Sequence, residues 1–439
     1  MPWKIQRHLA TGLMCVAFTH GAIAQDNAGA QIGLTLSPGF VYDDDEGRAR
    51  LGFDTAYETT TRNQRFLLGL DGAFDSGYEE LDESLRSPRL RLSYGRESSA
   101  TEVTAQLSFQ RDTIDALVFD DNLDRDFLES GTGLRTDLNA SLGLTFGRSA
   151  PFGGSVDLGY RSRGYPDADD PRLLEEETAN AGLSLRFTID PRVTARVSGR
   201  FSETDVENPG TDQRRTAVNA ALDLAVSRTL DVSLALGATE VVSTSPVDTE
   251  TNEGASSSLT AVRALPDGTL SAAIASDLTA GGRLSTLRVD RAFDLPDGAT
   301  LGFGAGIGQV DENDVQTLVR LSWSGETRTG GYSVRVDRTL AVNNEGDSAL
   351  NSIVSLSWRQ DLNRVSSFRT GLSLRDTTRL DDGADQTQAN LSLGWRRDLT
   401  EDWGVRATYT HRWTQEEGAD ETEDYTVFLG FEREFQWRP

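Results

Sequence analysis

Apolar and polar residues alternate along most of this chain. The clearest stretch is 134–146, where Leu, Thr, Ala and Phe at every second position are separated by polar or small residues. A period of two places successive side chains on opposite faces, so each stretch predicts a strand with one apolar and one polar face. The same pattern recurs in 51–57, 90–94, 103–109, 181–189, 193–201, 218–226, 230–236, 270–274, 301–307, 315–323, 332–336, 354–358, 391–395 and 405–409.

The connections between these stretches alternate between short and long. The short ones are 61–63, 97–100, 190–192, 227–229, 266–268, 296–298, 361–364 and 398–401. The long or acidic ones are 43–47, 75–87, 111–132, 164–177, 203–214, 243–254, 311–314, 343–347, 377–385 and 414–424. Short periplasmic turns alternating with longer outer loops are typical of an outer-membrane β-barrel. Counting from Ile32 predicts about 22 antiparallel strands (20–24) in one transmembrane up-and-down barrel, with both termini on the short-turn side.

Other all-β architectures fit the pattern less well. A β-helix would repeat at a short fixed period and a propeller at about 40 residues, and the chain shows neither. An array of sandwiches would not sort its loops by length, and no linker divides residues 31–439. We therefore predict a single barrel domain.

The N-terminus has the features of a secretory signal. Lys4 and Arg7 precede an apolar run over 9–18, and Ala22 to Ala24 form a small-x-small cleavage site. The prediction is a signal peptide over 1–24, a short periplasmic segment over 25–30 and the barrel over 31–439. Cys15 follows Met14 rather than a small residue, which disfavours lipidation. No other apolar run approaches the roughly 20 residues of a membrane helix, so any span must consist of strands.

Removal of residues 1–24 changes the composition. The only Cys, the only Lys and both Met lie in this segment, so disulfides and thiol chemistry are excluded from the mature chain. Two of the 43 basic residues also lie there, and the remaining 41 against 69 acidic residues give a net charge of −28. This charge disfavours a nucleic-acid partner.

The last stretch, Tyr425 to Trp437, alternates in the same way and ends on the aromatic residues Phe435 and Trp437. It resembles the terminal assembly signal of Gram-negative outer-membrane barrels, although the chain continues to Arg438 and Pro439. Through pattern rather than specific motifs, most of the mature chain resembles porin-like barrels, some of which are linked to polysaccharide export. The resemblance implies location in the cell outer membrane. It also implies contact with lipid and lipopolysaccharide, and with the barrel-assembly machinery through the last strand.

Arginine recurs on the polar faces, which are expected to line the lumen. The pore-lining candidates are Arg89, Arg91, Arg135, Asp137, Arg192, Arg196, Arg200, Arg335, Asp337, Arg406 and Arg412. Rings of charged side chains set ion selectivity in channels. The alternative is that these arginines pair with lumenal carboxylates and stiffen the wall, and the two roles are compatible.

Tryptophan lies near predicted strand ends, where amphipathic rings favour the membrane interface. The candidates for interface aromatics are Trp323, Trp358, Trp395, Trp403, Trp413 and Trp437. Strand propensity alone also enriches Trp.

The predicted outer loops are acidic at 43–46, 79–83, 175–177 and 416–424. They could hold divalent cations that bridge lipopolysaccharide phosphates, bias the vestibule against anions, or form a solvated surface. The segment 381–385 is too short to match a calcium loop.

We expect no enzyme activity, cofactor or resident metal. The one histidine of the mature chain, His411, shares the apolar face of Val405, Ala407 and Tyr409, where a general base would be misplaced. No metal-ligand spacing, phosphate-binding loop or nucleophile motif is present.

The expected function is passive diffusion of small polar or charged solutes, or export of an anionic polysaccharide. The alternative is a closed structural or adhesive barrel whose acidic loops bind partners. Strands begin soon after the signal, which argues against an N-terminal plug and hence against energised siderophore transporters, autotransporters and assembly-machinery barrels. Because barrels of about 22 strands are generally plugged, we expect inward-folding loops, chiefly 111–132, or a flattened cross-section.

Overall fold

The computed structural model describes residues 29–43, 46–77, 85–114, 133–168, 173–207, 209–311, 313–343, 346–380, 384–418 and 421–437. The predicted signal peptide over 1–24 lies outside these residues. So do most of the segment 25–30, the acidic stretch 79–83 and most of the loop 111–132, which was expected to fold inward.

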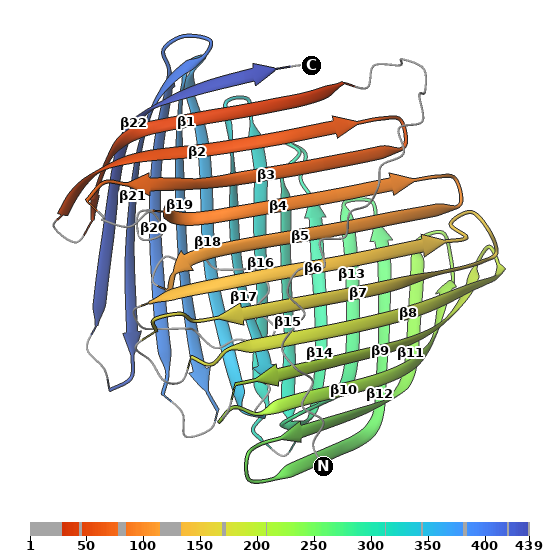
Figure 1. Cartoon of the computed structure of the whole chain (residues 1–439). Coiled ribbons are helices and arrows are strands. Elements are labelled where there is room, and N and C mark those ends of the chain that lie inside the picture. The colour runs from red at the N-terminus through yellow and green to blue at the C-terminus, as the bar shows by residue number, and fades with distance from the viewer. Residues whose placement is uncertain are drawn as a thin grey trace, which may run out of the picture.

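The described chain consists of 22 strands and their connections (Figure 1). The strands are β1 Ala30–Asp43, β2 Glu46–Thr60, β3 Gln64–Asp75, β4 Leu85–Glu97, β5 Thr101–Thr113, β6 Leu134–Phe146, β7 Phe152–Gly164, β8 Glu176–Asp190, β9 Val193–Val206, β10 Asp212–Ala225, β11 Leu230–Thr244, β12 Thr249–Leu265, β13 Gly268–Thr279, β14 Gly282–Asp294, β15 Thr300–Val310, β16 Gln316–Thr327, β17 Gly330–Val342, β18 Ser348–Asn363, β19 Ser366–Arg379, β20 Gln386–Asp398, β21 Trp403–Glu416 and β22 Thr422–Trp437.

Each strand pairs antiparallel with the next one in sequence, and the last strand pairs with the first. β1 meets β22 in a register that places Ile32 opposite Trp437 and Asp43 opposite Thr426. This pairing closes the sheet and leaves no free edge, which is what a strand-built membrane span requires. The predicted 22-strand antiparallel up-and-down barrel is confirmed.

Two long connections expected from the sequence are shorter in the structure. β11 continues to Thr244 and β12 begins at Thr249, so most of 243–254 is strand. β9 likewise reaches Val206 and β10 begins at Asp212. These strand ends are polar on both faces, so the apolar alternation stops before the backbone ladder does.

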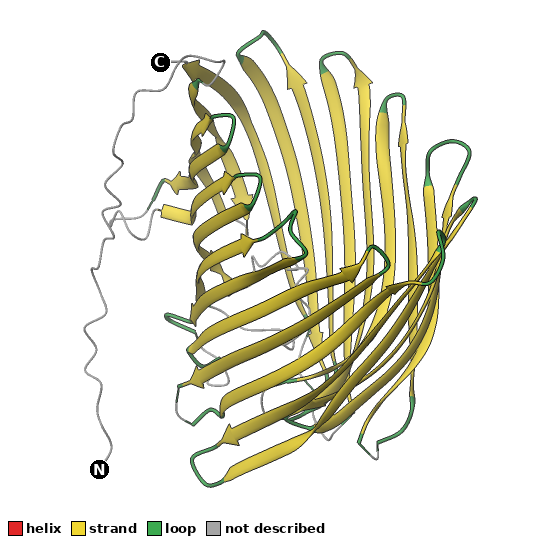
Figure 2. Cartoon of the chain, turned by 90° about the vertical axis from the view of Figure 1, so that its right-hand side faces the viewer, coloured by secondary structure: helices red, strands yellow, loops and turns green. Residues whose placement is uncertain are grey.

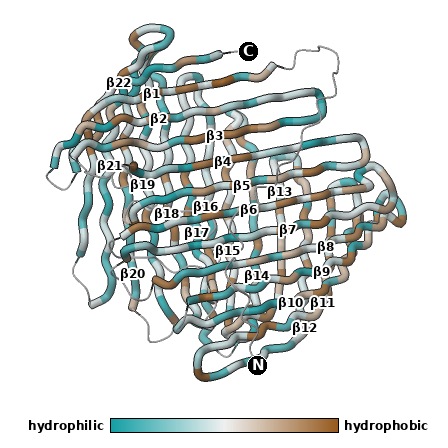
Figure 3. The backbone as a smooth tube through the Cα atoms, viewed as in Figure 1, coloured by the Kyte–Doolittle hydropathy of each residue, from teal (hydrophilic) through white to brown (hydrophobic). Residues whose placement is uncertain are grey.

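Large apolar side chains cover the outer face of the barrel. On β6 and β7, Leu142 is directly opposite Leu158. The next two strands carry Leu183 and Val197 on the same face, each two positions from direct opposition, and all four side chains are exposed. Figure 3 shows the resulting alternation of hydrophobic and hydrophilic positions along the strands. Within the described ranges, no helix is long and apolar enough to span a membrane.

The barrel has two broad walls whose strands cross in projection. In Figure 1, β2 to β11 form the nearer wall and β14 to β20 pass behind it. Figure 2 shows from the side how the walls continue into each other as one curved sheet. A small apolar cluster of Val310, Leu318, Leu340 and Leu350 lies near the end of the barrel that carries the longer loops.

β15 differs from the other strands on its inner face. Its inward positions 302, 304, 306 and 308 are all glycine. A Cβ on Gly306 would lie 2.4 Å from the carbonyl oxygen of Leu287 and 3.1 Å from the Cα atom of Arg288, so β14 approaches β15 closely there. Glycine in a strand interior is typical of a tight bend or of a close approach between backbones.

Candidate functional site

The strand register places most of the predicted arginines on the inner face of the barrel. Arg89 and Arg91 alternate with the outward Leu90 and Leu92 on β4. In the same way, Arg196 and Arg200 alternate with the outward Val197 on β9. These side chains are open to the lumen, since that of Arg91 is 60% exposed and that of Arg196 is 48% exposed.

A first charge cluster forms around Asp137 on β6. Arg135, two residues before it on the same face, donates two hydrogen bonds to its carboxylate at 2.7 and 3.2 Å. Arg163, directly opposite on β7, donates a third at 3.1 Å, and Arg161 lies 4.0 Å away. Asp137 and Arg163 are each only 4% exposed. Charge-assisted hydrogen bonds of this kind are strong, and each is needed because the groups are removed from water.

A second cluster forms around Asp337 on β17. Its carboxylate accepts a hydrogen bond at 3.1 Å from Nε of Arg320, which lies directly opposite on β16. Arg335, two residues before Asp337, lies 3.6 Å from the same oxygen, and Arg288 on β14 lies 3.9 Å from the other oxygen. The side chains of Arg320 and Arg335 are 42% and 49% exposed, so this cluster faces the lumen more openly than the first.

The two clusters lie on opposite walls. In a closed ring of 22 strands, β6 and β17 are 11 strands apart in either direction, and therefore diametrically opposed. Counted from the long-loop end, Asp137 is the fourth residue of β6 and Asp337 the sixth residue of β17. Each cluster brings three guanidinium groups to one carboxylate. A second inward acid lies beside each, since Asp112 is directly opposite Arg135, and Asp290 and Arg320 both pair with Gly304.

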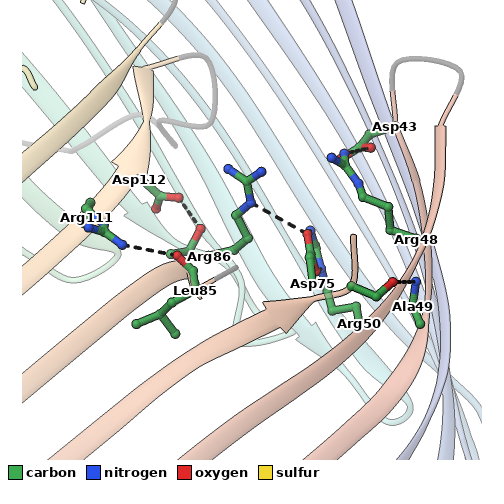
Figure 4. Close-up of polar contacts among 11 residues, drawn as sticks. Asp43, Arg48, Ala49, Arg50, Asp75, Leu85, Arg86, Arg111 and Asp112 are labelled. Carbon is green, nitrogen blue, oxygen red and sulfur yellow. Dashed lines mark hydrogen bonds and ion pairs between the residues drawn. The ribbon is translucent and has the colours of Figure 1, made fainter. Parts of the chain in front are cut away.

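A third set of ion pairs lies at the long-loop rim of β2 to β5 (Figure 4). Arg50 donates to both oxygens of the buried Asp75, at 2.6 and 2.7 Å, and Arg86 approaches the same carboxylate at 3.8 Å. Arg89, one of the predicted residues, pairs with Asp112 at 3.0 Å. Several arginines of the wall therefore pair with buried carboxylates, as expected if these arginines stiffen the wall.

Arg192 differs from the expectation. It lies in the two-residue turn between β8 and β9, where its backbone N–H donates to Asp190, rather than on the strand face of Arg196. Arg406 and Arg412 are both on the inner face of β21, at opposite ends of the strand, and Arg412 lies 3.7 Å from Asp424.

The predicted interface tryptophans all lie on the outward face. Trp323, Trp358, Trp395, Trp403 and Trp437 are near the short-turn end of their strands, and Trp413 is near the long-loop end. Several contact neighbouring rings, for example Trp323, whose ring lies 4.7 Å from that of Tyr332 between centroids. This distribution favours one well-marked aromatic belt at the short-turn interface.

Sequence reasoning did not single out Arg161, Arg163, Arg288 and Arg320. Arg161 and Arg163 belong to the alternating stretch of β7 and could have been found from their inward parity. Arg288 and Arg320 join Asp337 only because strand pairing brings three chain segments together. In the sequence, both clusters are marked by an Arg-x-Asp motif, which is Arg135 to Asp137 in the first and Arg335 to Asp337 in the second.

His411 is on the outward face of β21, as its parity predicts. Its ring stacks on Trp413 at 3.9 Å, and Nδ1 lies 3.0 Å from the Tyr409 hydroxyl. Nε2 is 3.7 Å from a carboxylate oxygen of Glu423. In the part of the chain that the structure describes, no group of three or more His, Cys, Asp and Glu side chains could hold a metal ion.

No protein-family model matches this chain, and no curated protein matches its sequence. Solved structures match its fold. The ferric-catecholate import receptor Fiu from E. coli K12 aligns with 94% of this chain and 82% of its own, at 9% identity and a TM-score of 0.58. The FrpB iron transporter from Neisseria meningitidis gives the same coverage, 11% identity and a TM-score of 0.58. A mutant of the ferric enterobactin receptor PfeA from Pseudomonas aeruginosa covers 94% and 81%, at 10% identity and a TM-score of 0.56. At these identities the likeness is one of fold, and it places this chain among 22-strand barrels of the outer-membrane type.

Proposed function

We propose that this protein is an outer-membrane transport barrel that passes small polar or charged solutes, with a preference for anions. The observation that carries the proposal is the pair of arginine clusters on opposite inner walls, around Asp137 and Asp337. A cationic constriction raises the local concentration of anions and lowers their energy in a low-dielectric surrounding. The polar inner face and the apolar outer face support a water-filled lumen in a membrane.

Two further features support conduction by this lumen. Several inward arginines, including Arg91, Arg320 and Arg335, have side chains that are 42–60% exposed. The inward positions 302 to 308 of β15 are glycine, so no side chain of β15 lies between Arg288 and Arg320 there. An anionic polysaccharide would meet the same arginines as a small anion, so export of such a glycan uses the same surface.

The solved structures suggest a second candidate cargo. Those proteins are described as receptors or transporters for ferric catecholates, ferric enterobactin or iron. A catecholate complex of iron presents anionic oxygens, to which guanidinium groups are well suited. Reduction of the current by an added ferric catecholate would favour this cargo over small anions.

Single-channel recording of the refolded mature protein in a planar bilayer tests the proposal. We expect discrete conducting steps and, in a KCl gradient, a reversal potential on the anion-selective side. No current from protein that is demonstrably folded and inserted would instead favour the closed structural or adhesive barrel.

A further inference from the structure

A cavity lies at the short-turn end of β6 to β9, away from the two arginine clusters. Its volume is about 360 Å³, within the range of small-molecule sites. Its polar lining comes from three hydroxyl groups and three guanidinium groups. The residues that line it are Thr145, Phe146, Arg148, Gly154, Ser155, Ser184, Arg186 and Arg196.

Arg186 on β8 and Arg196 on β9 are directly opposite each other across the strand pair. Like charges in this position destabilise a sheet unless other groups compensate them. Arg196 has one such group, since it donates to Asp223 at 2.9 Å. Among the described residues, Arg186 donates only to carbonyl oxygens of the 147–150 turn, at 3.0 to 3.5 Å, and its Nε is buried without a hydrogen-bond partner.

The third arginine of the lining is already paired. Arg148 contacts the carboxylate of Glu97 and lies 3.5 Å from that of Glu102. The hydrogen bond to Glu97 is the larger cause that raises the pKa of the Arg148 guanidinium. Another acid of the inner face, Asp157, accepts a bond from Ser155 at 3.4 Å and does not line the cavity. Arg186 therefore brings a positive charge that no carboxylate in the described residues contacts.

Two other pairs of directly opposed arginines lie on the inner face of the barrel. Arg396 and Arg406 are also directly opposite each other on the inner face, on β20 and β21. There Arg396 contacts two carboxylates, Asp398 at 3.2 Å and Glu432 at 3.3 Å. Arg359 and Arg369 form another opposed pair, but both are exposed, so water screens their repulsion.

We propose that the Arg186 and Arg196 cavity binds a phosphate group. A tetrahedral oxyanion between the two guanidiniums would compensate their charges and accept hydrogen bonds from the hydroxyls of Ser155 and Ser184. Arginine is suited to such groups because its planar fork donates two parallel bonds. The group belongs either to a free solute in the lumen or to a phospholipid headgroup at the membrane interface, beside the aromatic cluster of Phe146, Phe152 and Phe187.

The first arm of the test is calorimetric titration of inorganic phosphate into full-length mature protein in a non-ionic, phosphate-free detergent. Binding by the wild type that weakens at least about tenfold in Arg186→Gln/Arg196→Gln supports a free-solute site. Arg396→Gln/Arg406→Gln is the matched control and should bind like the wild type. Because no current is measured, failure here is separate from failure of the proposed conduction.

The second arm is native mass spectrometry of the protein released from phosphatidylglycerol vesicles. One retained lipid fewer in Arg186→Gln/Arg196→Gln, with no binding of inorganic phosphate, supports a headgroup site. Ser184→Asp places a carboxylate in the cavity while sparing the contacts of Arg186 with the turn, so it should lose the ligand without loss of folding. The proposal is overturned if the wild type binds neither probe, or if the double variant and Ser184→Asp bind both as the wild type does.

Discussion

The clusters around Asp137 and Asp337 share two parts and differ in the third. Each has an arginine two residues before the aspartate and another directly opposite on the neighbouring strand. The third arginine of the first cluster, Arg161, comes from the adjacent strand β7, whereas Arg288 reaches Asp337 from β14, three strands away. The clusters differ in the strands that separate the charged residues. Between Arg288 and Asp337 lies β15, whose inward positions 302, 304, 306 and 308 are all glycine.

In the Asp337 cluster, inward glycines accompany an ion pair that spans three strands. The pair Arg215 and Asp277 also spans three strands, from β10 to β13. The inward residues that separate them include Gly254, but the residue directly opposite Arg215 is Val241. Small inward residues allow the wall to curve tightly, so that side chains converge across intervening strands.

The largest effect should come from Asp137→Asn. Its partners Arg163 and Arg135 have side chains that are only 5% and 11% exposed, so water cannot replace the carboxylate. We expect a loss of about 3–5 kcal/mol in the free energy of unfolding. Urea unfolding in vesicles, followed by tryptophan fluorescence, measures it.

Asp337→Asn should cost less, about 1.5–3 kcal/mol, because Arg320 and Arg335 are half exposed and become hydrated. The same urea unfolding serves for both variants. If Asp337→Asn costs as much as Asp137→Asn, exposure of the arginines does not control the energetics of these clusters.

Gly306→Ala should destabilise the barrel by about 1–3 kcal/mol, because its Cβ would meet the backbone of β14. Gly95→Ala is the matched control, since a Cβ at this inward position of β4 meets nothing within 4 Å. The temperature at which the folded band of each variant is lost on a gel would measure the stability of both. Equal melting of the two variants would show that β15 does not need its glycines.

Arg91→Gln should have the smallest effect, below about 1 kcal/mol, because its pair with Asp71 is exposed. The pair should also weaken in high salt. A loss comparable with that of Asp137→Asn would show that adjacent-strand pairs carry more stability than their exposure suggests.

Much of the fold could be predicted from the sequence. The period of two, the alternation of connection lengths and the last strand, Tyr425 to Trp437, together predict a barrel of about 22 strands (20–24). Inward parity also identified Arg135, Asp137, Arg335 and Asp337. The contacts of Arg288 and Arg215 were not predictable, because they depend on the curvature of the closed sheet rather than on spacing in one strand. The expected position of Arg192 on the inner face of a strand was wrong, because alternation alone cannot show where a strand ends and a turn begins.

The reversal potential in a KCl gradient shows most directly whether the inward arginines line a conducting lumen. The account predicts that wild-type channels favour anions and that Arg320→Gln/Arg335→Gln shifts the potential toward cation selectivity. Arg214→Gln, which removes an equally exposed but outward arginine, should leave it unchanged. Equal potentials in the wild type and the double variant, or no current from folded and inserted protein, would contradict the account.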